Sequence, residues 1–399
     1  MTSFDTIVSR RNTNSLKWEE AGDPDVLPLW VADMDFLAAP CIREALRQRV
    51  EHGVFGYSVV PDTYYDAIIQ WFRHRHHWTM DRQWILYTTG VVPAISCVIK
   101  AIAMPGDKVL LTTPVYNCFF SSVRNNGCEV LTSPLQVGSE GKYEINWTDF
   151  ETKCADPKTV AYILCNPHNP GGRVWKPEEL QRIGEICRRH HVWVVSDEIH
   201  NELVMPGYTY TPFASVCAEN QMCSVTCISP SKSFNIAGLQ IANIVCEDGE
   251  LRRRIDRAIN INEVCDVNPF GIVATIAAYS EEGELWLQEL QQYLSGNYQA
   301  LLHHAAFAPG AASLSTTPAP VVMPLEGTYL VWVNVESLCQ RFHCDVEQLT
   351  ARLLHEAKVY FNPGTMYGDE GRDFLRINIA CPRAVLTEAL DRFSSFIAG

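Results

Sequence analysis

The sequence lacks long hydrophobic runs and has little positive charge. No segment reaches the roughly 20 apolar residues that a membrane-spanning helix needs, so we expect no membrane association. Residues 1–20 are polar and charged, without an apolar signal core, and we therefore expect a cytoplasmic protein. The formal net charge of −14 at pH 7 argues against binding to nucleic acid or to anionic membranes, because both attract positive surfaces.

No pattern of cysteine or histidine predicts a disulfide framework or a metal site. The 15 cysteines are odd in number, scattered, and without a Cys-x-x-Cys pair, which is typical of reduced, mostly buried thiols. The run Arg73-His74-Arg75-His76-His77 contains three histidines. Histidines that bind one metal from a helix are usually four residues apart, whereas these three mostly point in different directions around the helix. We interpret this run as the solvated, basic end of a helix and predict no metal.

What the sequence does contain is a regular alternation of apolar strands and helical patterns. Hydrophobic residues make up 47% and charged residues 20%, as in ordinary folded domains. The alternation predicts an α/β protein with a doubly wound, mostly parallel sheet and a second, smaller α+β domain. We expect residues 1–49 to form an arm and part of the small domain, 50–285 the large domain, and 286–399 the small C-terminal domain. The stretch 308–326 is rich in Ala, Pro, Ser and Thr and predicts a surface linker.

Three buried strands end in polar residues. The runs are Asn166-Pro167-His168-Asn169-Pro170, Ser196-Asp197-Glu198-Ile199-His200 and Ser229-Pro230-Ser231-Lys232-Ser233. Ligands of parallel sheets bind at the carboxyl ends of the strands, so an amide, an acid and an amine should meet there. Burial favours the neutral, nucleophilic form of a lysine, and we interpret Lys232 as an amine that bonds a cofactor carbonyl. An ordinary solvated loop lysine is the alternative.

These motifs, in this order, resemble a fold type I pyridoxal-phosphate enzyme of the aminotransferase class I/II superfamily. The closer resemblance is to the cystathionine β-lyase branch of MalY/PatB type, and it covers nearly the whole chain. It rests also on the runs Leu29 to Phe36, His52 to Tyr57, Lys232 to Ile236, and Asn362 to Gly368. The resemblance implies pyridoxal 5'-phosphate as cofactor, a small amino-acid substrate, and a homodimer with shared active sites.

The resemblance also implies a role for each residue around the cofactor. Lys232 would bond the cofactor and then act as the base for the substrate α-proton. Asp197 would keep the pyridine nitrogen protonated; capping a helix is its alternative role. Asn169 would donate to the phenolic oxygen, with support from His200, which stands where many relatives have tyrosine. The phosphate would lie among Gly90, Val91, Val92, Ser229, Ser231 and the partner subunit's Tyr57. A solvent-exposed loop aromatic is the alternative for Tyr57.

Other residues would serve the substrate. Tyr116 would stack on the pyridine ring and present its phenol to the substrate, and core packing is the alternative. Arg376 would grip the α-carboxylate with its planar fork, and a structural salt bridge is the alternative. Tyr57, Trp30 and Asp33 are assigned to the substrate at the mouth of the site. Gln240 stands where aminotransferases usually present an arginine to the phosphate, which weakens the analogy to that activity.

The predicted function is therefore a carbon–sulfur β-lyase. It would cleave L-cystathionine or a related L-cysteine S-conjugate to a thiol, pyruvate and ammonia. Either Lys232 or Tyr116 would protonate the departing thiolate, and the sequence leaves both open. A class I/II aminotransferase, which needs the same lysine, aspartate and arginine, is the alternative. A regulatory or binding protein that uses the fold as an interaction surface is the third possibility.

Overall fold

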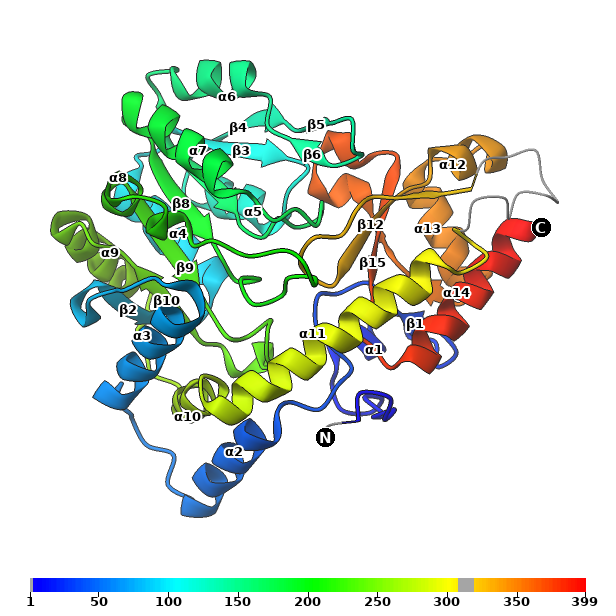
Figure 1. Cartoon of the computed structure of the whole chain (residues 1–399), viewed down its shortest axis with the longest axis horizontal. Coiled ribbons are helices and arrows are strands. Elements are labelled where there is room, and N and C mark those ends of the chain that lie inside the picture. Colours follow the sequence, from blue (N-terminus) through cyan, green and yellow to red (C-terminus); the bar gives the residue numbers. More distant parts are fainter. Residues whose placement is uncertain (1–2, 308–318) are drawn as a thin grey trace.

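A seven-stranded sheet forms the centre of the computed structural model, which describes residues 3–307 and 319–399 (Figure 1). Its strand order is β2-β10-β9-β8-β7-β3-β4, and all strands run in one direction except β10, which is antiparallel to both neighbours. The prediction of a mostly parallel sheet is confirmed. The strands are β2 (Ile85–Thr88), β3 (Lys108–Thr113), β4 (Glu129–Pro134), β7 (Thr159–Cys165), β8 (Trp193–Asp197), β9 (Ser224–Ile228) and β10 (Ala242–Val245).

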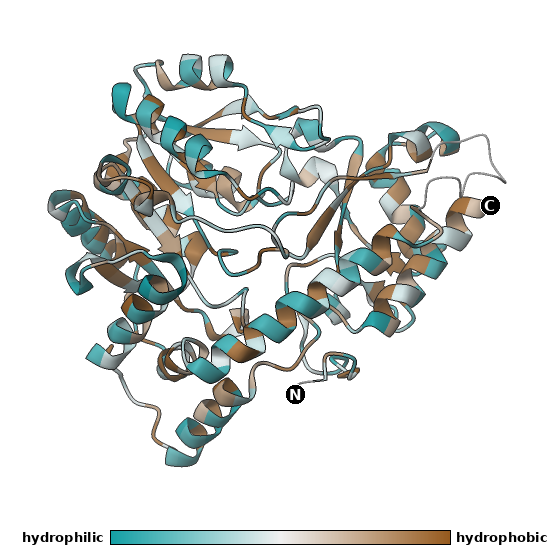
Figure 2. Ribbon diagram, in the orientation of Figure 1, coloured by the Kyte–Doolittle hydropathy of each residue, from teal (hydrophilic) through white to brown (hydrophobic). Residues whose placement is uncertain are grey.

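Helices cover both faces of this sheet, which explains why its strands are continuous apolar runs. Along β7, Ala161 and Ile163 belong to the core on one face, whereas Tyr162 and Leu164 belong to the core on the other. The first face carries α4 (Val91–Ile102), α5 (Cys118–Asn125) and α9 (Gly249–Ile261), and the second carries α6 (Trp147–Cys154) and α7 (Pro177–Arg189), with α8 (Ala218–Met222) beside α7. Figure 2 shows apolar residues concentrated on the strands and polar residues on the outer sides of these helices.

A smaller antiparallel sheet lies beside the central one, in the order β11-β12-β15-β14. Its strands are β11 (Val321–Val322), β12 (Leu330–Asn334), β14 (Asn362–Pro363) and β15 (Phe374–Asn378). The helices of this region are α12 (Glu336–Phe342), α13 (Val346–His355) and α14 (Arg383–Ala398). The long helix α11 (Glu281–Leu302) runs from the region of α10 (Pro269–Ala278), α2 (Pro40–His52) and α3 (Asp62–His76) towards α14 (Figure 1).

The predicted domain boundary at 285/286 falls inside α11, and the division into domains stays a prediction. Of the predicted linker, residues 308–318 lie outside the described residues. Within the two described ranges, the structure contains no helix with the length and apolar character to cross a membrane. The remaining short elements are α1 (Leu16–Glu19), the parallel pair β1 (Leu27–Pro28) and β13 (Val359–Tyr360), and the hairpin of β5 (Gln136–Val137) and β6 (Tyr143–Glu144).

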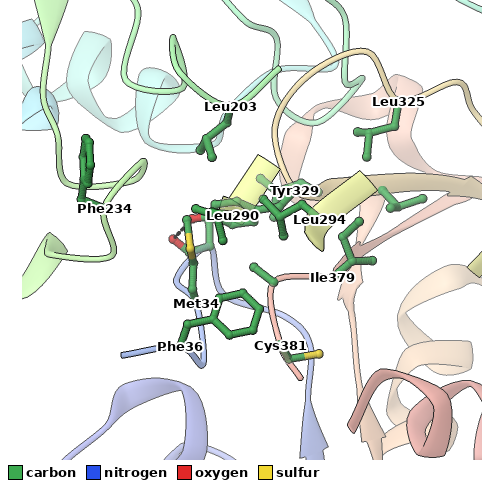
Figure 3. Packing of buried hydrophobic residues seen from close by; sticks show 14 of the residues in the cluster. Met34, Phe36, Leu203, Phe234, Leu290, Leu294, Leu325, Tyr329, Ile379 and Cys381 are labelled. Carbon is green, nitrogen blue, oxygen red and sulfur yellow. Dashed lines mark hydrogen bonds between the residues drawn. The ribbon is translucent and has the colours of Figure 1, made fainter. Parts of the chain in front are cut away.

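Residues 29–36, which we call the strap, cross from the small sheet to the loop that carries Lys232. Met34 and Phe36 of the strap are buried in the same hydrophobic cluster as Leu290 and Leu294 of α11 (Figure 3). Two asparagine side chains hold its backbone. The Asn378 amide donates to the carbonyl oxygens of Val31 and Asp33 at 2.6 and 2.7 Å. The Asn235 amide donates to those of Met34 and Phe36 at 3.0 and 2.8 Å and accepts from the Met34 N–H at 3.0 Å.

Candidate active site

A cavity of about 210 Å³ lies where β7, β8 and β9 end. It is smaller than the ~300–1,000 Å³ usual for drug-sized ligands, and so suits a small molecule. The structure brings most of the residues predicted from the sequence to its wall. These are Gly90, Val91, Val92, Tyr116, Asn169, Asp197, His200, Ser231 and Lys232.

Lys232 enters this cavity from the turn that follows β9. Ser229 shapes the turn, because its hydroxyl donates to the Ile241 carbonyl oxygen at 2.6 Å and accepts from the Ser231 N–H at 3.1 Å. The Lys232 Nζ donates to the carbonyl oxygen of Ala32 in the strap at 2.6 Å. Burial lowers the pKa of this amine below its ordinary value, Arg376 acts in the same direction, and nearby carboxylates oppose the shift. The environment therefore favours a neutral, nucleophilic amine.

Asp197 is the last residue of β8 and is 3% exposed. One carboxylate oxygen, Oδ1, accepts a hydrogen bond from the Ile199 N–H at 3.1 Å. Burial raises the pKa of Asp197 to about 7, and the neighbouring Glu198 contributes in the same direction, whereas Lys232 opposes it. A carboxylate held in this way is stabilised by any cation that binds beside it.

Arg376, on β15, connects the small sheet to the cavity. Its Nη1 donates to the Asn169 side-chain oxygen at 3.0 Å and its Nη2 to the Trp30 carbonyl oxygen at 2.8 Å, while Nε is buried without a partner. Because the oxygen of Asn169 is already an acceptor, its NH₂ group remains available as a donor. The guanidinium also lies 4.9 Å from the centre of the Tyr367 ring.

His200 lines the cavity and carries an unsatisfied buried nitrogen. Its Nδ1 is buried and has no hydrogen-bond partner. Burial, together with Lys232 and Arg376, lowers the pKa of the imidazole to about 3, so the ring is neutral at physiological pH. Buried polar atoms are nearly always satisfied in folded proteins, and an unpaired one that lines a cavity points to a ligand that pairs with it.

The start of α4 forms the opposite end of the cavity. Gly90 is the N-cap residue of this helix, and Val91 and Val92 begin its first turn. The first N–H groups of a helix have no partner within the helix and attract anions. Ser231 lines the same cavity and can add a hydroxyl. Ser229, which was predicted to join this group, is instead 1% exposed with its hydroxyl committed to the backbone of the turn.

Tyr116 follows β3, and its ring meets Phe119 edge-on with the ring centres 5.7 Å apart. Burial raises the pKa of Tyr116, so the phenol keeps its proton at neutral pH. Sequence reasoning missed Cys165, which also lines the cavity and whose Sγ accepts from the Asn169 N–H at 3.4 Å. It also missed Ala32, although this residue lies inside the strap motif that carried the resemblance. No feature of the sequence shows which atoms of that motif face the lysine.

Five predicted residues do not line the cavity of their own chain: Ser229 and Arg376, described above, and Trp30, Asp33 and Tyr57. The Trp30 indole stacks on Tyr360 with ring centres 4.9 Å apart, and only its carbonyl oxygen meets Arg376. The Asp33 carboxylate is paired with Arg10 at 2.6 Å. Tyr57 is fully exposed, on the segment that joins α2 to α3 at the periphery of the molecule (Figure 1).

The histidine-rich end of α3 has a structural role. The Nε2 of His76 lies 2.7 Å from the buried Glu202 carboxylate, which Arg75 also contacts at 2.9 Å. In residues 3–307 and 319–399, no group of three or more His, Cys, Asp or Glu side chains is arranged to hold a metal ion.

The donors around the cavity fit pyridoxal phosphate. The amine of Lys232 suits the aldehyde of that molecule, and the buried carboxylate of Asp197 suits its pyridine nitrogen. The phenolic oxygen is matched by the amide of Asn169 and the unpaired imidazole nitrogen of His200. The helix N-terminus matches its phosphate. Fold and site together define a pyridoxal-phosphate-dependent enzyme. The chain belongs to the family described as aminotransferase class I and II, whose model matches residues 24–393.

Comparison with individual proteins shows which members of this family the chain resembles. The chain is 39% identical to cystathionine beta-lyase PatB of Bacillus subtilis (strain 168), over 99% of this chain and 100% of the relative. It is 34% identical to protein MalY of Escherichia coli (strain K12), over 98% and 97% of the two chains. The structure matches that of a pyridoxal-phosphate-bound C-S lyase from Staphylococcus hominis with a TM-score of 0.88 and 32% identity, over 98% of both chains. The resemblance stated from the sequence is confirmed.

Proposed function

We propose that this protein is a carbon–sulfur β-lyase that cleaves L-cystathionine or a related L-cysteine S-conjugate to a thiol, pyruvate and ammonia. The observation that carries the proposal is that a lysine amine with a lowered pKa shares a small cavity with Asn169, and that a buried arginine on the adjacent sheet, Arg376, is bound to the side chain of Asn169. The similarity to PatB and to the C-S lyase supports lyase chemistry over transamination.

When bound, pyridoxal phosphate supplies an electron sink for the bond that breaks at the substrate α-carbon. The residues of the chain supply binding, orientation and proton transfer. Asp197 would hold the proton of the pyridine nitrogen, Asn169 and His200 would orient the ring through its phenolic oxygen, and the amides of Gly90 to Val92 and the Ser231 hydroxyl would hold the phosphate. Asp197 is almost fully buried, so the charge it stabilises is screened little by water.

Arg376 binds the substrate α-carboxylate, and its buried Nε is a donor that such a ligand would satisfy. Its bond to Asn169 would fix the guanidinium relative to a side chain that would contact the cofactor. Lys232 Nζ takes the α-proton as a neutral amine. The protonated phenol of Tyr116 and the charged Lys232 are both able to donate a proton to the departing sulfur, and both assignments stay open.

Purified protein tests the proposal directly. The wild type is expected to be yellow and to release pyruvate from L-cystathionine, whereas Lys232→Ala should lose both the colour and the turnover. Lys108→Ala is a matched control, because Lys108 pairs with Asp156 at 2.6 Å on the first residue of β3 and away from the cavity wall. Rapid exchange of amino groups with a keto acid and no pyruvate would establish the aminotransferase instead.

We further infer a homodimer in which each active site receives Tyr57 from the other subunit. The segment after α2 exposes a series of large apolar side chains, and Phe55 packs only partly against Phe270. The exposed fractions are 63% for Val54, 55% for Phe55 and 82% for Val59. Mixing Lys232→Ala subunits with Tyr57→Ala subunits should restore part of the activity, because one site of each mixed dimer is then intact. Mixtures that stay inactive would contradict the sharing.

The remaining expectations are also proposals. A cytoplasmic location is supported by the 15 cysteines, which are all free thiols, since a reducing compartment keeps thiols in this state. Cell fractionation with an antibody against the chain tests it. The division into residues 1–49, 50–285 and 286–399 is supported by the presence of two separate sheets, and limited proteolysis tests it.

A further inference from the structure

The carbonyl oxygen of Ala32 accepts two hydrogen bonds from opposite parts of the fold. One comes from the Lys232 Nζ at 2.6 Å, and the other from the phenol of Tyr329 at 3.0 Å. A carbonyl oxygen has two lone pairs, so these two donors saturate it. Tyr329 is 0% exposed and directly precedes β12, which places it on the small sheet, far in sequence from the strap and from the lysine.

Nothing in the wall of the cavity explains why a tyrosine is needed at this position. The ring of Tyr329 meets the His200 ring edge-on, with centres 6.0 Å apart, and phenylalanine would keep this contact. The hydroxyl has one polar partner, the Ala32 carbonyl. Burial raises the pKa of the phenol strongly, so it acts as a donor and never as a base under physiological conditions. Its chemical effect therefore reaches the reaction only through that carbonyl oxygen.

We propose that Tyr329 is a positioning residue that occupies one lone pair of the Ala32 carbonyl oxygen and leaves Lys232 a single, weakened acceptor. The inference rests on the proposed function, in which Lys232 bonds the cofactor and later moves the substrate proton. An ammonium group has three donors and is stabilised by every acceptor it reaches, whereas a neutral amine needs fewer. By limiting the acceptors, Tyr329 disfavours the ammonium form of the amine and fixes its direction between turnover steps.

Several charged and titratable groups also face the Lys232 amine, and they act whether or not the hydroxyl of Tyr329 is present. Asp33 of the strap and Asp197 at the end of β8 favour the ammonium form, and Cys118 at the start of α5 acts in the same direction. Arg376 on β15 opposes it, and His200 is neutral. Removal of one hydroxyl leaves this set unchanged, so a change in the titration of Lys232 in that variant reports on the Ala32 carbonyl.

The variant Tyr329→Phe isolates the hydroxyl. In cofactor-free protein, the freed lone pair becomes available to the ammonium or to water, so the midpoint of Lys232 deprotonation should move up by about half a pH unit to one unit. Tyr64→Phe is the matched control, because Tyr64 is also 0% exposed and its phenol donates one bond, to the Asn243 side-chain oxygen at 2.9 Å. Tyr329→Met serves as a second variant without the hydroxyl.

The assay measures covalent attachment and not turnover. Cofactor-free proteins receive short pulses of pyridoxal phosphate between pH 6.5 and 10, borohydride fixes the adduct, and peptide mass spectrometry quantifies modified Lys232. The rate of modification should rise with pH around a midpoint that is higher in both Tyr329 variants than in wild type and Tyr64→Phe. Unchanged midpoints in the Tyr329 variants, or an equal shift in Tyr64→Phe, would overturn this inference alone. Modification of wild type at other lysines but not at Lys232 would overturn the proposed function as well.

Discussion

Replacing Asp197 by asparagine should stabilise the cofactor-free protein at alkaline pH. The pKa of Asp197 is raised from 3.8 to about 7, chiefly by burial. A carboxyl group with a higher pKa in the folded state binds its proton more tightly there, so its favourable contribution is complete below about pH 4 and is lost as the pH rises through 7. The difference between the two pKa values corresponds to roughly 4 kcal/mol of folding free energy at pH 8 and above.

Asparagine removes the charge and keeps the shape. Its side-chain oxygen can still accept a hydrogen bond from the Ile199 N–H, so the substitution removes no protein hydrogen bond of residue 197. Thermal unfolding of cofactor-free wild type and Asp197→Asn between pH 5 and 9 measures the effect. The variant should gain stability relative to wild type as the pH rises, and the gap should be smallest near pH 5. Asp156→Asn, at a surface carboxylate paired with Lys108, should show no such gain.

Adding pyridoxal phosphate should reverse the order of the two proteins. The pyridinium supplies the cation that the buried carboxylate lacks, so wild type should gain more stability from the cofactor than Asp197→Asn does. The activity of the variant should fall by about 10²-fold or more, in line with the loss of a buried electrostatic partner. A gap that does not change with pH would contradict the raised pKa of Asp197, and equal stabilisation of both proteins by the cofactor would contradict its proposed place beside the pyridine nitrogen.

Two further substitutions test the binding of the substrate carboxylate by Arg376 and the anchoring of the strap by Lys17. Arg376→Lys should lower kcat/KM for amino-acid substrates by about 10- to 100-fold, mainly by raising KM. The reason is that a point charge replaces a planar guanidinium whose paired hydrogen bonds are worth roughly 1.5–3 kcal/mol. An unchanged KM would contradict the assignment of Arg376 to the substrate carboxylate. Lys17→Met should destabilise the protein by roughly 1.5–3 kcal/mol in denaturant unfolding, because Lys17 is 1% exposed and pairs with the buried Asp35 at 2.8 Å, which among the described residues keeps only Arg10 as an ion-pair partner in the variant. Arg47→Met, at an exposed pair, should have little effect.

Much of the candidate site could be predicted because neighbouring parallel strands end at one edge of a sheet. The strands β7, β8 and β9 are adjacent and parallel, so the polar residues that follow them converge whatever the details of packing. This topology and the apolar runs that precede them were enough to predict that Asn169, Asp197 and Lys232 lie close together. The start of α4 could also be predicted from the sequence, because Gly90 directly precedes a strongly apolar helix.

Side-chain direction could not be predicted where tertiary contacts decide it. The turn after β9 carries several hydroxyl side chains, and only the tertiary contact with the Ile241 carbonyl oxygen shows that the Ser229 hydroxyl binds the backbone and does not line the cavity. Trp30 lies in the strap motif, yet its indole stacks on Tyr360, from a strand more than 300 residues later. The predicted domain boundary at 285/286 lies inside α11, which begins at Glu281, directly after its N-cap residue Ser280, whose hydroxyl accepts from the Gly283 N–H.

Two adjacent carboxylates at the end of β8 show how the fold separates structure from function. Glu198 accepts hydrogen bonds from the Ser196 hydroxyl at 2.7 Å, the Phe213 N–H at 2.9 Å, and the Tyr210 phenol. Asp197 points to the other face of the strand and has one donor, the Ile199 N–H. Burial raises the pKa of both, but only Asp197 keeps an oxygen without a protein partner beside the cavity. The protein thus satisfies Glu198 internally and leaves one oxygen of Asp197 without a partner. If a cationic ligand binds there, as proposed, its binding and the folding stability should be coupled through Asp197.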